Sequence, residues 1–255
     1  MSRAATDAET LRGRVVLVTG SGCGLGAALV KTAAERRARV VVNCKSDERR
    51  AETLGRQIQE SGGEALVCRA DVSVYDEAEA LVKETVRAFG RVDVLVNTVG
   101  TFNWKPVADT EPDEWRSLMA SNLDSVYHMC RVVLPHMRKN HWGRIVNFGA
   151  VGAERADGQP KVAAYSAAKA AVIAFSKALA LEEARCGITV NVVCPGVLRD
   201  GEETAHAVEA HLADRVPVGR AGHADDIVRT ILFFSSPAAD FITGQVLSVA
   251  GGWRL

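Results

Sequence analysis

The sequence predicts a three-layer, doubly wound α/β fold, and two patterns carry that prediction. Seven short runs of mostly apolar, β-branched residues alternate with longer alanine-rich stretches whose apolar residues recur at helical spacing. Each short run is apolar nearly throughout, which is typical of strands in a parallel sheet that helices cover on both faces. With 255 residues, 47% of them hydrophobic, the chain can bury one such core. We therefore expect a seven-stranded parallel sheet with helices on both faces.

The predicted elements follow one another in regular alternation, which is the order that a doubly wound fold requires. The predicted strands are Arg14–Thr19, Arg39–Asn43, Ala65–Arg69, Val92–Asn97, Gly143–Phe148, Ile188–Val193 and Gln245–Val249. The predicted helices include Gly26–Arg37, Tyr75–Phe89, Glu114–Arg138, Ala163–Arg185 and Ala224–Ser235. We expect a flexible lead-in over residues 1–12 and a single domain over 13–255. A polar, acidic segment at about 197–216 interrupts the alternation and is a candidate active-site lid.

Composition and charge argue against several other classes of protein. Lys plus Arg and Asp plus Glu both number 31, so nothing favours nucleic acid or an anionic membrane as a partner. No apolar run approaches the roughly 20 residues that span a bilayer, and the start lacks the apolar core of a secretory signal. The six cysteines form no C-x-x-C pair, and no cysteine or histidine shows metal-ligand spacing. We expect a cytoplasmic protein with reduced thiols and no metal site.

The first predicted strand leads directly into a glycine-rich turn. The segment reads VVLVTGSGCGLG and contains Gly20, Gly22, Gly24 and Gly26. Glycine permits positive φ and lets backbone N–H groups approach a pyrophosphate, and the helix that follows presents its positive N-terminal end to the same group. A strand before the turn and a helix after it are the context that dinucleotide binding requires. A tight turn without a ligand is the alternative interpretation.

Tyr165 and Lys169 lie four residues apart in a predicted helix. That spacing places both side chains on one face, with Cβ atoms roughly 5–6 Å apart. An ordinary tyrosine has a pKa of about 10, and a neighbouring ammonium is expected to lower that pKa toward the working pH. The pair is therefore a candidate acid–base unit, with two surface residues as the alternative.

Several motifs occur in an order that resembles the short-chain dehydrogenase/reductase family. They are Thr19-Gly20-x-x-x-Gly24-x-Gly26, Asp71 in ADVS, Asn97 and Gly100 in NTVG, Asn122 in SNLDS, Tyr165 and Lys169 in YSAAK, and Pro195-Gly196. The resemblance covers nearly the whole chain, and the C-terminal segment is similar to the 3-oxoacyl-[acyl-carrier-protein] reductase branch. It implies a Rossmann-type fold and reduction of a ketone or 3-oxoacyl carbonyl to an alcohol by hydride transfer from NADP(H).

The resemblance also implies roles for the matching residues. Tyr165 would donate a proton to the substrate carbonyl oxygen, Lys169 would hold the nicotinamide ribose, and Asn122 would support a water-mediated proton relay. Asp71 would contact the adenine; from the residues alone it could be the N-cap of the helix that follows, and the two roles are compatible. The implied cofactor-binding set is Gly20, Ser21, Gly24, Leu25, Gly26, Lys45, Ser46, Asp71, Val72, Asn97, Gly100, Tyr165, Lys169, Pro195, Gly196 and Val197.

Similar proteins are commonly homo-oligomers, so the resemblance implies a tetramer or a dimer. Tyr127, Met129 and Phe175 lie on the predicted helices that such proteins use for assembly. They are candidate interface residues, with intramolecular core as the alternative.

The end of the second predicted strand favours NADP(H) over NAD(H). In dinucleotide folds an acidic residue there binds the 2′-hydroxyl of NAD, and by resemblance that residue is Cys44. A thiol cannot hold a ribose diol as a carboxylate does, whereas Lys45 and Ser46 suit a 2′-phosphate. Cys23 counts against NADP(H), because relatives that use this cofactor often carry a basic residue there. A solvated lysine is the alternative interpretation of Lys45.

Ala150 stands where the family normally has a catalytic serine, and no Ser or Thr occurs from Val126 to Ala164. Loss of one oxyanion donor costs about 10²–10³ in rate, which slows hydride transfer without abolishing it. Glu154, Asp157, Gln159 or a water molecule could supply a substitute donor, with a solvated loop as the alternative interpretation of these three residues. The sequence thus leaves open an active carbonyl reductase or a poorly catalytic, cofactor-binding subunit or sensor. Reduction of another bond, such as an imine or pterin-like C=N bond, with a different polar group in place of the serine, is a further alternative.

Overall fold

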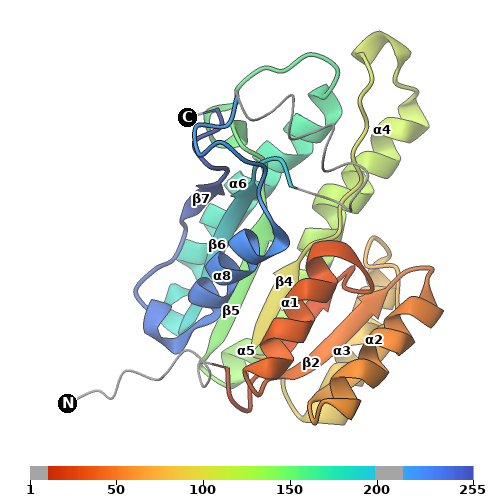
Figure 1. Ribbon diagram of the computed structural model, residues 1–255, viewed down its shortest axis with the longest axis vertical. Helices are drawn as coiled ribbons and strands as arrows, with labels where there is room; N and C mark the ends of the chain where they lie inside the picture. The colour runs from red at the N-terminus through yellow and green to blue at the C-terminus, as the bar shows by residue number, and fades with distance from the viewer. Residues whose placement is uncertain (1–10, 199–214, 255) are drawn as a thin grey trace.

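The computed structural model describes residues 11–198 and 215–254, which form a seven-stranded parallel sheet between two layers of helices (Figure 1). The strands are β1 (Val15–Thr19), β2 (Arg39–Cys44), β3 (Glu64–Arg69), β4 (Val94–Asn97), β5 (Gly143–Phe148), β6 (Ile188–Pro195) and β7 (Val246–Val249). Their order in the sheet is β3-β2-β1-β4-β5-β6-β7, and every pair is parallel. The predicted fold class is confirmed. The order reverses between β1 and β4, and in such sheets ligands bind beyond the carboxyl ends of the strands at this switch point.

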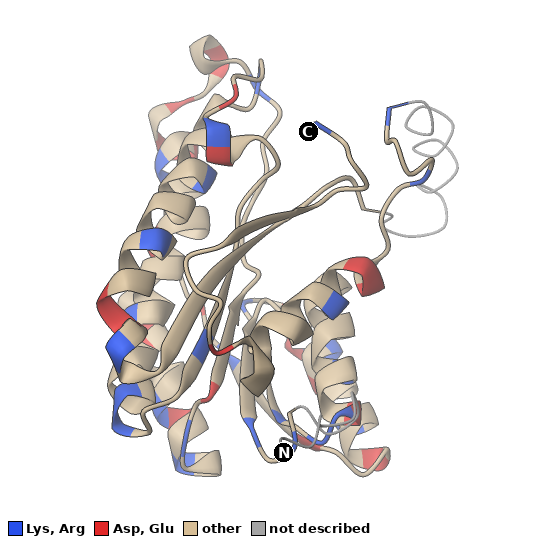
Figure 2. Ribbon diagram, turned by 90° about the vertical axis from the view of Figure 1, so that its left-hand side faces the viewer, with Lys and Arg blue, Asp and Glu red and all other residues tan. Residues whose placement is uncertain are grey.

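Each face of the sheet has its own hydrophobic core. The helices are α1 (Gly24–Glu35), α2 (Glu48–Glu60), α3 (Tyr75–Phe89), α4 (Pro112–Met119), α5 (Ser125–Lys139), α6 (Ala163–Glu183) and α8 (Ala224–Ser235). Side chains of α1, α2 and α8 pack on one face, and those of α3, α5 and α6 pack on the other (Figure 2). Within β2, Val40 and Val42 belong to the first core and Val41 to the second. Strands buried on both faces explain why the predicted runs are apolar throughout.

Helix α2 is absent from the predicted helices because most of its residues are polar. Its buried residues are Ala51, Leu54, Gly55 and Ile58. The helix begins after Asp47, whose side chain accepts a hydrogen bond from the backbone nitrogen of Arg50 at 3.0 Å. This N-cap and a narrow apolar stripe suffice to form the helix when the stripe packs against the sheet.

The predicted helix Glu114–Arg138 is interrupted in the structure. A π-helical turn, Ala120–Asp124, separates α4 from α5 and contains the buried Asn122. Such turns are frequent at functional sites because they redirect a side chain. The interruption therefore marks Asn122 as a positioned residue.

The predicted domain boundary needs a small correction. Leu11 is only 1% exposed and belongs to the core, so the folded part begins before residue 13. The predicted lid at about 197–216 lies almost entirely outside the described residues.

Helix α6, together with the turn after it, is long and apolar enough to cross a membrane by length and composition alone. It carries the buried Lys169 and packs along the sheet, as the core helix of a folded domain does. The described residues contain no other such helix.

Candidate active site

The glycine turn lies at the carboxyl end of β1, at the switch point of the sheet. Gly20 has a φ of 62°, and a Cβ added to it would lie 2.9 Å from Cγ2 of Val99. A Cβ added to Gly26 would lie 2.7 Å from the Cα of Ser21. Both positions therefore require glycine. Gly24, at φ 55°, has no neighbour within 4 Å of such a Cβ, so its backbone is open to an approaching phosphate.

Buried polar side chains hold the turn in place. The Ser21 hydroxyl donates to the carbonyl oxygen of Val18 at 2.7 Å and accepts from the backbone nitrogen of Asn43 at 3.0 Å. The Asn43 side chain accepts from the Gly20 nitrogen at 3.0 Å and donates to the Ala70 carbonyl at 3.1 Å. The hydroxyl of Ser21, a predicted cofactor ligand, is thus used within the chain. Asn43 is a supporting residue that the sequence analysis missed, although an asparagine inside an apolar strand was a usable signal.

Lys45 and Asp71 meet beyond the ends of β2 and β3. Their Nζ and Oδ2 atoms are 2.6 Å apart. Burial opposes ionisation of Asp71, but hydrogen bonds from Lys45 and Ser73 outweigh it and lower the pKa of the carboxyl group. Asp71 also accepts from the Ser73 nitrogen at 3.0 Å, while α3 begins after Val74. The alternative interpretation of Asp71 as a helix N-cap is therefore wrong.

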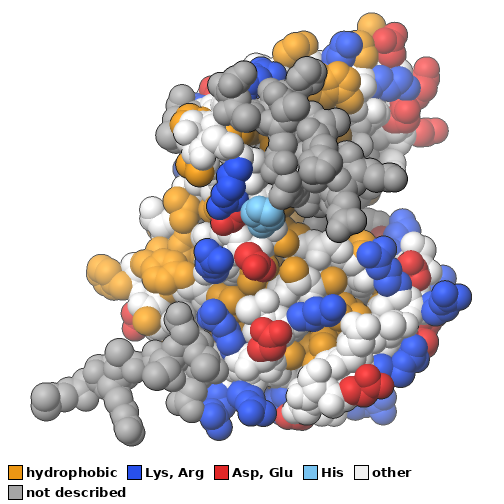
Figure 3. All heavy atoms as spheres, viewed as in Figure 1, with side chains coloured by type: hydrophobic (Ala, Val, Ile, Leu, Met, Phe, Trp, Pro, Cys, Tyr) orange, Lys and Arg blue, Asp and Glu red, His pale blue; other side chains and the backbone are white. Residues whose placement is uncertain are grey.

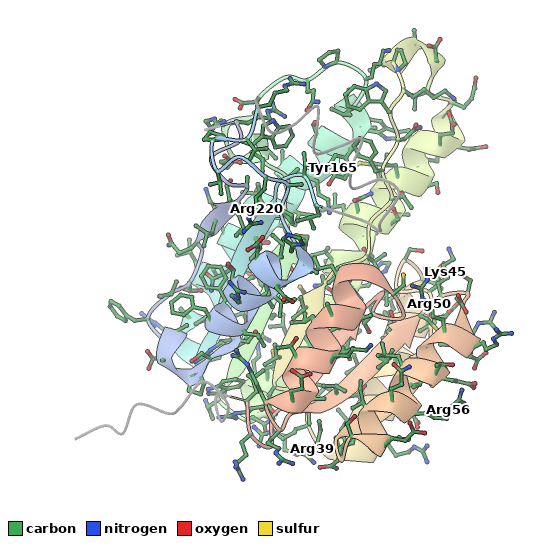
Figure 4. The ribbon with its side chains drawn as sticks, in the orientation of Figure 1. Arg39, Lys45, Arg50, Arg56, Tyr165 and Arg220 are labelled. Carbon is green, nitrogen blue, oxygen red and sulfur yellow. The ribbon has the colours of Figure 1, made fainter. Side chains whose placement is uncertain are left out.

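The three predicted catalytic side chains converge beyond the ends of β4 and β5. Nζ of Lys169 lies 5.6 Å from the centroid of the Tyr165 ring and donates to the Phe148 carbonyl at 3.1 Å. A Cβ added to Gly100 would collide with Oδ1 of Asn122 and lie 3.3 Å from Nζ of Lys169. Figure 4 places Tyr165 above the sheet, well separated from Lys45 and Arg50 at the end of α2. The site thus extends along one edge of the sheet.

Burial dominates the electrostatics of the Tyr–Lys pair. It lowers the pKa of Lys169 to about 8 and raises the pKa of Tyr165 above its ordinary value. The expected lowering of the tyrosine pKa is therefore wrong in this structure, because desolvation of the phenol outweighs any attraction from the ammonium. Tyr165 keeps its proton at neutral pH and is suited to donate it.

Asn122 presents an unused acceptor beside Lys169. Its side-chain nitrogen donates to the carbonyl oxygens of Thr101 at 2.8 Å and Leu118 at 3.0 Å. Its Oδ1 is buried and has no hydrogen-bond partner among the described residues. A buried acceptor of this kind needs a donor from water or a ligand, since leaving it unpaired costs free energy.

Asn97 belongs to a buried amide network. Its side-chain nitrogen donates to Oδ1 of Asn147 at 2.8 Å, and Asn147 donates to the Ser176 hydroxyl at 2.9 Å. These bonds join β4, β5 and α6. Asn97, which is predicted to bind the cofactor, thus has a structural role in this network, and the sequence analysis missed Asn147 and Ser176.

The other predicted cofactor residues follow the same edge of the sheet. At the end of β6 the Gly196 nitrogen donates to the Val249 carbonyl at 3.0 Å, and a Cβ on Gly196 would lie 2.7 Å from Cα of Ala250. Of the remaining members, Ser46 is exposed, Val72 is buried, and three are partly buried: Leu25, Pro195 and Val197. The edge therefore brings the predicted set into one row.

A cavity of about 240 Å³ opens beside Tyr165. Ala150 lines it together with aromatic side chains, among them Phe102, Trp104 and Trp253. The residue that replaces the family's serine thus faces the same space as the candidate proton donor. Apart from Tyr165, Ser166 supplies the one hydroxyl in the described lining.

The structure separates the three suggested substitute donors. Asp157 lines the cavity, but a hydrogen bond from Arg155 at 2.8 Å lowers the pKa of its carboxyl group, so the group is ionised and has no proton to donate. Oε1 of Gln159 accepts from Arg254 at 2.6 Å, which leaves its amide nitrogen as a donor. Glu154 has a buried, unpartnered Oε2 but does not line the cavity. Gln159 is the best placed of the three.

In the described part of the chain, no group of three His, Cys, Asp or Glu side chains is arranged to hold a metal ion.

The candidate interface residues differ in burial. Met129 is fully buried in the core of its own chain. Tyr127 is 46% exposed, and its ring centroid lies 6.3 Å from that of Phe175.

Comparisons with known proteins agree with this geometry. A protein-family model described as enoyl-(acyl carrier protein) reductase matches residues 20–254. The 3-oxoacyl-[acyl-carrier-protein] reductase FabG of Haemophilus influenzae is 36% identical over 247 residues, which cover 96% of this chain and 100% of that protein. The (2S)-[(R)-hydroxy(phenyl)methyl]succinyl-CoA dehydrogenase subunit BbsD of Thauera aromatica is 35% identical, with 96% of this chain and 98% of that protein covered.

A solved structure shows the same likeness. The gluconate 5-dehydrogenase of Burkholderia cenocepacia, in complex with NADP and tartrate, matches with a TM-score of 0.88 and 35% identity. The match covers 96% of this chain and 97% of that one. Matches in sequence and in structure thus extend over nearly the whole molecule, from the glycine turn through the Tyr–Lys helix to the C-terminal strand. The chain therefore belongs to the short-chain dehydrogenase/reductase family.

Proposed function

We propose that this protein is an NADP(H)-dependent oxidoreductase that reduces a ketone or 3-oxoacyl carbonyl to an alcohol. One observation carries the proposal. Tyr165 lies beside Lys169 and borders a cavity at the same edge of the sheet as the glycine turn. The NADP bound to the similar gluconate 5-dehydrogenase supports the choice of cofactor, as does the absence of a carboxylate at Cys44.

The residues of this chain fit a dinucleotide along the edge. The open backbone at Gly24 suits a pyrophosphate. A side chain at position 100 would collide with Oδ1 of Asn122 and crowd Nζ of Lys169, so glycine at this position keeps the space beside Lys169 open. NADPH, when bound, supplies the hydride that reaches the carbonyl carbon. Tyr165 donates its proton to the carbonyl oxygen, because its raised pKa keeps the phenol protonated until that oxygen becomes basic.

Lys169 and Asn122 prepare Tyr165 for the next cycle. The Phe148 carbonyl holds the Lys169 ammonium in place, and a pKa of about 8 allows this lysine to exchange a proton near neutral pH. The free Oδ1 of Asn122 is placed to orient a water molecule that passes a proton inward. This is the role that the family resemblance predicts for Asn122.

Ala150 favours a second candidate function. Without a hydroxyl at this position the cavity has one fewer donor for the carbonyl oxygen. A loss of about 10²–10³ in rate would turn the protein into a poorly catalytic, cofactor-binding subunit or sensor.

One pair of measurements tests the proposal and separates the two functions. NADPH binding is measured by fluorescence titration, and NADPH oxidation is followed with a panel of small ketones and acetoacetyl thioesters. We expect binding together with turnover of at least one substrate. Binding without turnover across the panel would favour the second function, and absence of binding to either nicotinamide nucleotide would refute both.

We further propose that the chain forms a homo-oligomer. Phe241 is fully exposed, Phe233 is 50% exposed and Leu247 of the edge strand β7 is 44% exposed. Figure 3 shows hydrophobic side chains gathered beside α8 at the left of the molecule. A contiguous apolar patch of this kind is typical of an interface. Light scattering of the wild type and of Phe241→Asp measures the assembly, and an unchanged mass for the variant would argue against this face.

We also propose a reducing, cytoplasmic location, which the cysteines support. All six are free thiols, and Cys44, Cys130 and Cys194 are buried. Scattered free cysteines are typical of proteins in compartments that keep thiols reduced.

A further inference from the structure

A groove of about 700 Å³ lies between α1 and α2, beside the glycine turn. Cys23 and Lys31 line it from the turn and from α1. Arg50, Leu54 and Gln57 line it from α2, at spacings that place them on one face of that helix. Lys45, the predicted ligand of a 2′-phosphate, is not part of this lining.

The groove begins where a dinucleotide fold recognises the adenosine ribose. A Cβ added to Gly22 would lie 3.5 Å from Cβ of Cys44, at the end of β2, and 3.5 Å from Cβ of Ala51. The end of this strand is the place where such folds distinguish a 2′-hydroxyl from a 2′-phosphate. Arg50 directly precedes Ala51 in the first turn of α2, so a long side chain at position 50 starts beside that place.

The charges in the groove suit an anion. Lys31, Arg49 and Arg50 line it, and Asp47 is the one carboxylate in the described lining. Asp47 accepts from the Arg50 backbone nitrogen at 3.0 Å, so its carboxylate is engaged in the N-cap of α2. Figure 3 shows basic side chains along α1 and α2 on this face of the molecule.

Lys45 and Arg50, the two candidate ligands of the 2′-phosphate, differ in their existing contacts. Nζ of Lys45 is 2.6 Å from Oδ2 of Asp71, so a phosphate would have to compete with a carboxylate for it. In the described part of the chain the Arg50 guanidinium has neither an ion pair nor a hydrogen bond. Figure 4 shows both side chains at the same end of α2, with Arg56 further along the helix. Lys31 and Arg49 also line the groove, but of these three cations Arg50 is the one that directly precedes Ala51 beside the end of β2, so it is the best placed to take a ligand there.

We infer that Arg50 binds the 2′-phosphate of NADP(H), in place of the basic residue that Cys23 lacks. The inference rests on the proposed function for its cofactor. A guanidinium offers paired donors that match phosphate oxygens, and the small side chain of Cys23 leaves the path from α2 to the ribose open. Lys45 instead fixes Asp71 at the adenine side. Arg50 thereby selects the phosphorylated dinucleotide.

The test uses half-cofactors that carry no nicotinamide, so it does not depend on catalysis. Calorimetry compares adenosine 2′,5′-bisphosphate with AMP on the full-length wild type and on three variants. Arg50→Gln removes the proposed ligand and Lys45→Gln removes the competing candidate. Arg56→Gln is the matched control, because Arg56 lies on the same helix outside the groove, where its guanidinium donates to the Thr53 hydroxyl at 3.1 Å and lies 3.9 Å from Glu52.

We expect the wild type to bind the bisphosphate more tightly than AMP. Arg50→Gln should weaken bisphosphate binding about 10- to 100-fold, the range expected for hydrogen bonds between charged groups, and leave AMP binding unchanged. Arg56→Gln should change neither. A selective loss in Lys45→Gln with no loss in Arg50→Gln would overturn the inference, as would an equal loss of both ligands in Arg50→Gln.

The wild type separates failure of this inference from failure of the proposed function. Equal affinity for both half-cofactors would overturn the role of Arg50 and leave the dinucleotide site intact. Absence of binding to either half-cofactor, and to NADPH and NADH, would overturn the proposed function itself.

Discussion

The glycine-turn half of the molecule and its catalytic half treat buried polar groups in opposite ways. Around the turn, the side chains of Ser21 and Asn43 form hydrogen bonds with the chain's own backbone and hold that backbone in a conformation that can bind a phosphate. At the catalytic end, Lys169 is buried and Asn122 keeps an acceptor unpaired. The binding half thus gains rigidity from satisfied bonds, whereas the catalytic half retains groups whose partners must come from water or substrate.

The largest expected effect is on the proton donor. Tyr165→Phe removes the hydroxyl and should lower the rate of carbonyl reduction about 10²–10⁴-fold, the usual contribution of a general acid. NADPH binding should persist, because the glycine-turn half is untouched. Steady-state kinetics and a binding titration measure the two halves separately. Tyr127→Phe, at an exposed tyrosine outside the cavity, is the control. An unchanged rate in Tyr165→Phe would remove Tyr165 from the mechanism.

Ala150→Ser probes the missing donor. If the absent serine limits catalysis, the new hydroxyl should raise the rate by up to about 10²–10³-fold at unchanged NADPH affinity. Ala153→Ser places a hydroxyl in the lining of the same cavity at a different point and should not raise the rate. Turnover numbers for both variants decide the matter. Equal rates for Ala150→Ser and the wild type would show that the oxyanion donor belongs elsewhere.

Lys169→Met measures the cost of the buried charge. In the folded chain the pKa of Lys169 is about 8, against 10.5 ordinarily, so burial disfavours its protonated form. Below pH 8 the full free-energy cost of burying the charged lysine is present. Between pH 8 and pH 10.5 the unfolded chain binds more protons than the folded chain, so the stability of the wild type rises with pH. The variant should therefore be more stable at pH 7 by up to about 3 kcal/mol.

Chemical denaturation at pH 7 and at pH 10 tests this sign. The advantage of Lys169→Met should shrink toward the higher pH, whereas the exposed Lys177→Met should show no such trend. An advantage that grows with pH would contradict a lowered lysine pKa.

Gly26→Ala should produce the smallest effect and tests the rigidity of the turn. The added methyl would lie 2.7 Å from Cα of Ser21 and 2.9 Å from the Gly20 carbonyl oxygen, so the backbone must move. Overpacking of this kind costs about 1–3 kcal/mol, and NADPH affinity should fall with it. Gly158→Ala is the control, because its Cβ would have no neighbour within 4 Å. Calorimetric unfolding that leaves Gly26→Ala unchanged would mean that the turn is softer than its contacts suggest.

The fold and the main positions of the site could be predicted from local patterns in the sequence. Apolar runs at strand length and apolar spacing at helix length are local properties. The strands, the glycine turn and every helix named above except α2 could therefore be predicted without a structure, with α4 and α5 predicted as one helix. The pairing of Tyr165 with Lys169 was equally local, since a helix brings residues four apart onto one face. Helix α2 was missed because its apolar stripe is short and most of its residues are polar.

The chemical behaviour of these groups depends on contacts between elements that are distant in the chain. Asn43 and Asn147 bond to residues far away in the chain, and no local pattern reveals such partners. The pKa of Tyr165 rises rather than falls because the burial around it comes from several elements. Lys45 is engaged by Asp71 while Arg50 faces the groove, a contrast that depends on how α2 packs against α1. Spacing along the chain sets which residues are neighbours on one element, but desolvation and ion pairing depend on which elements meet.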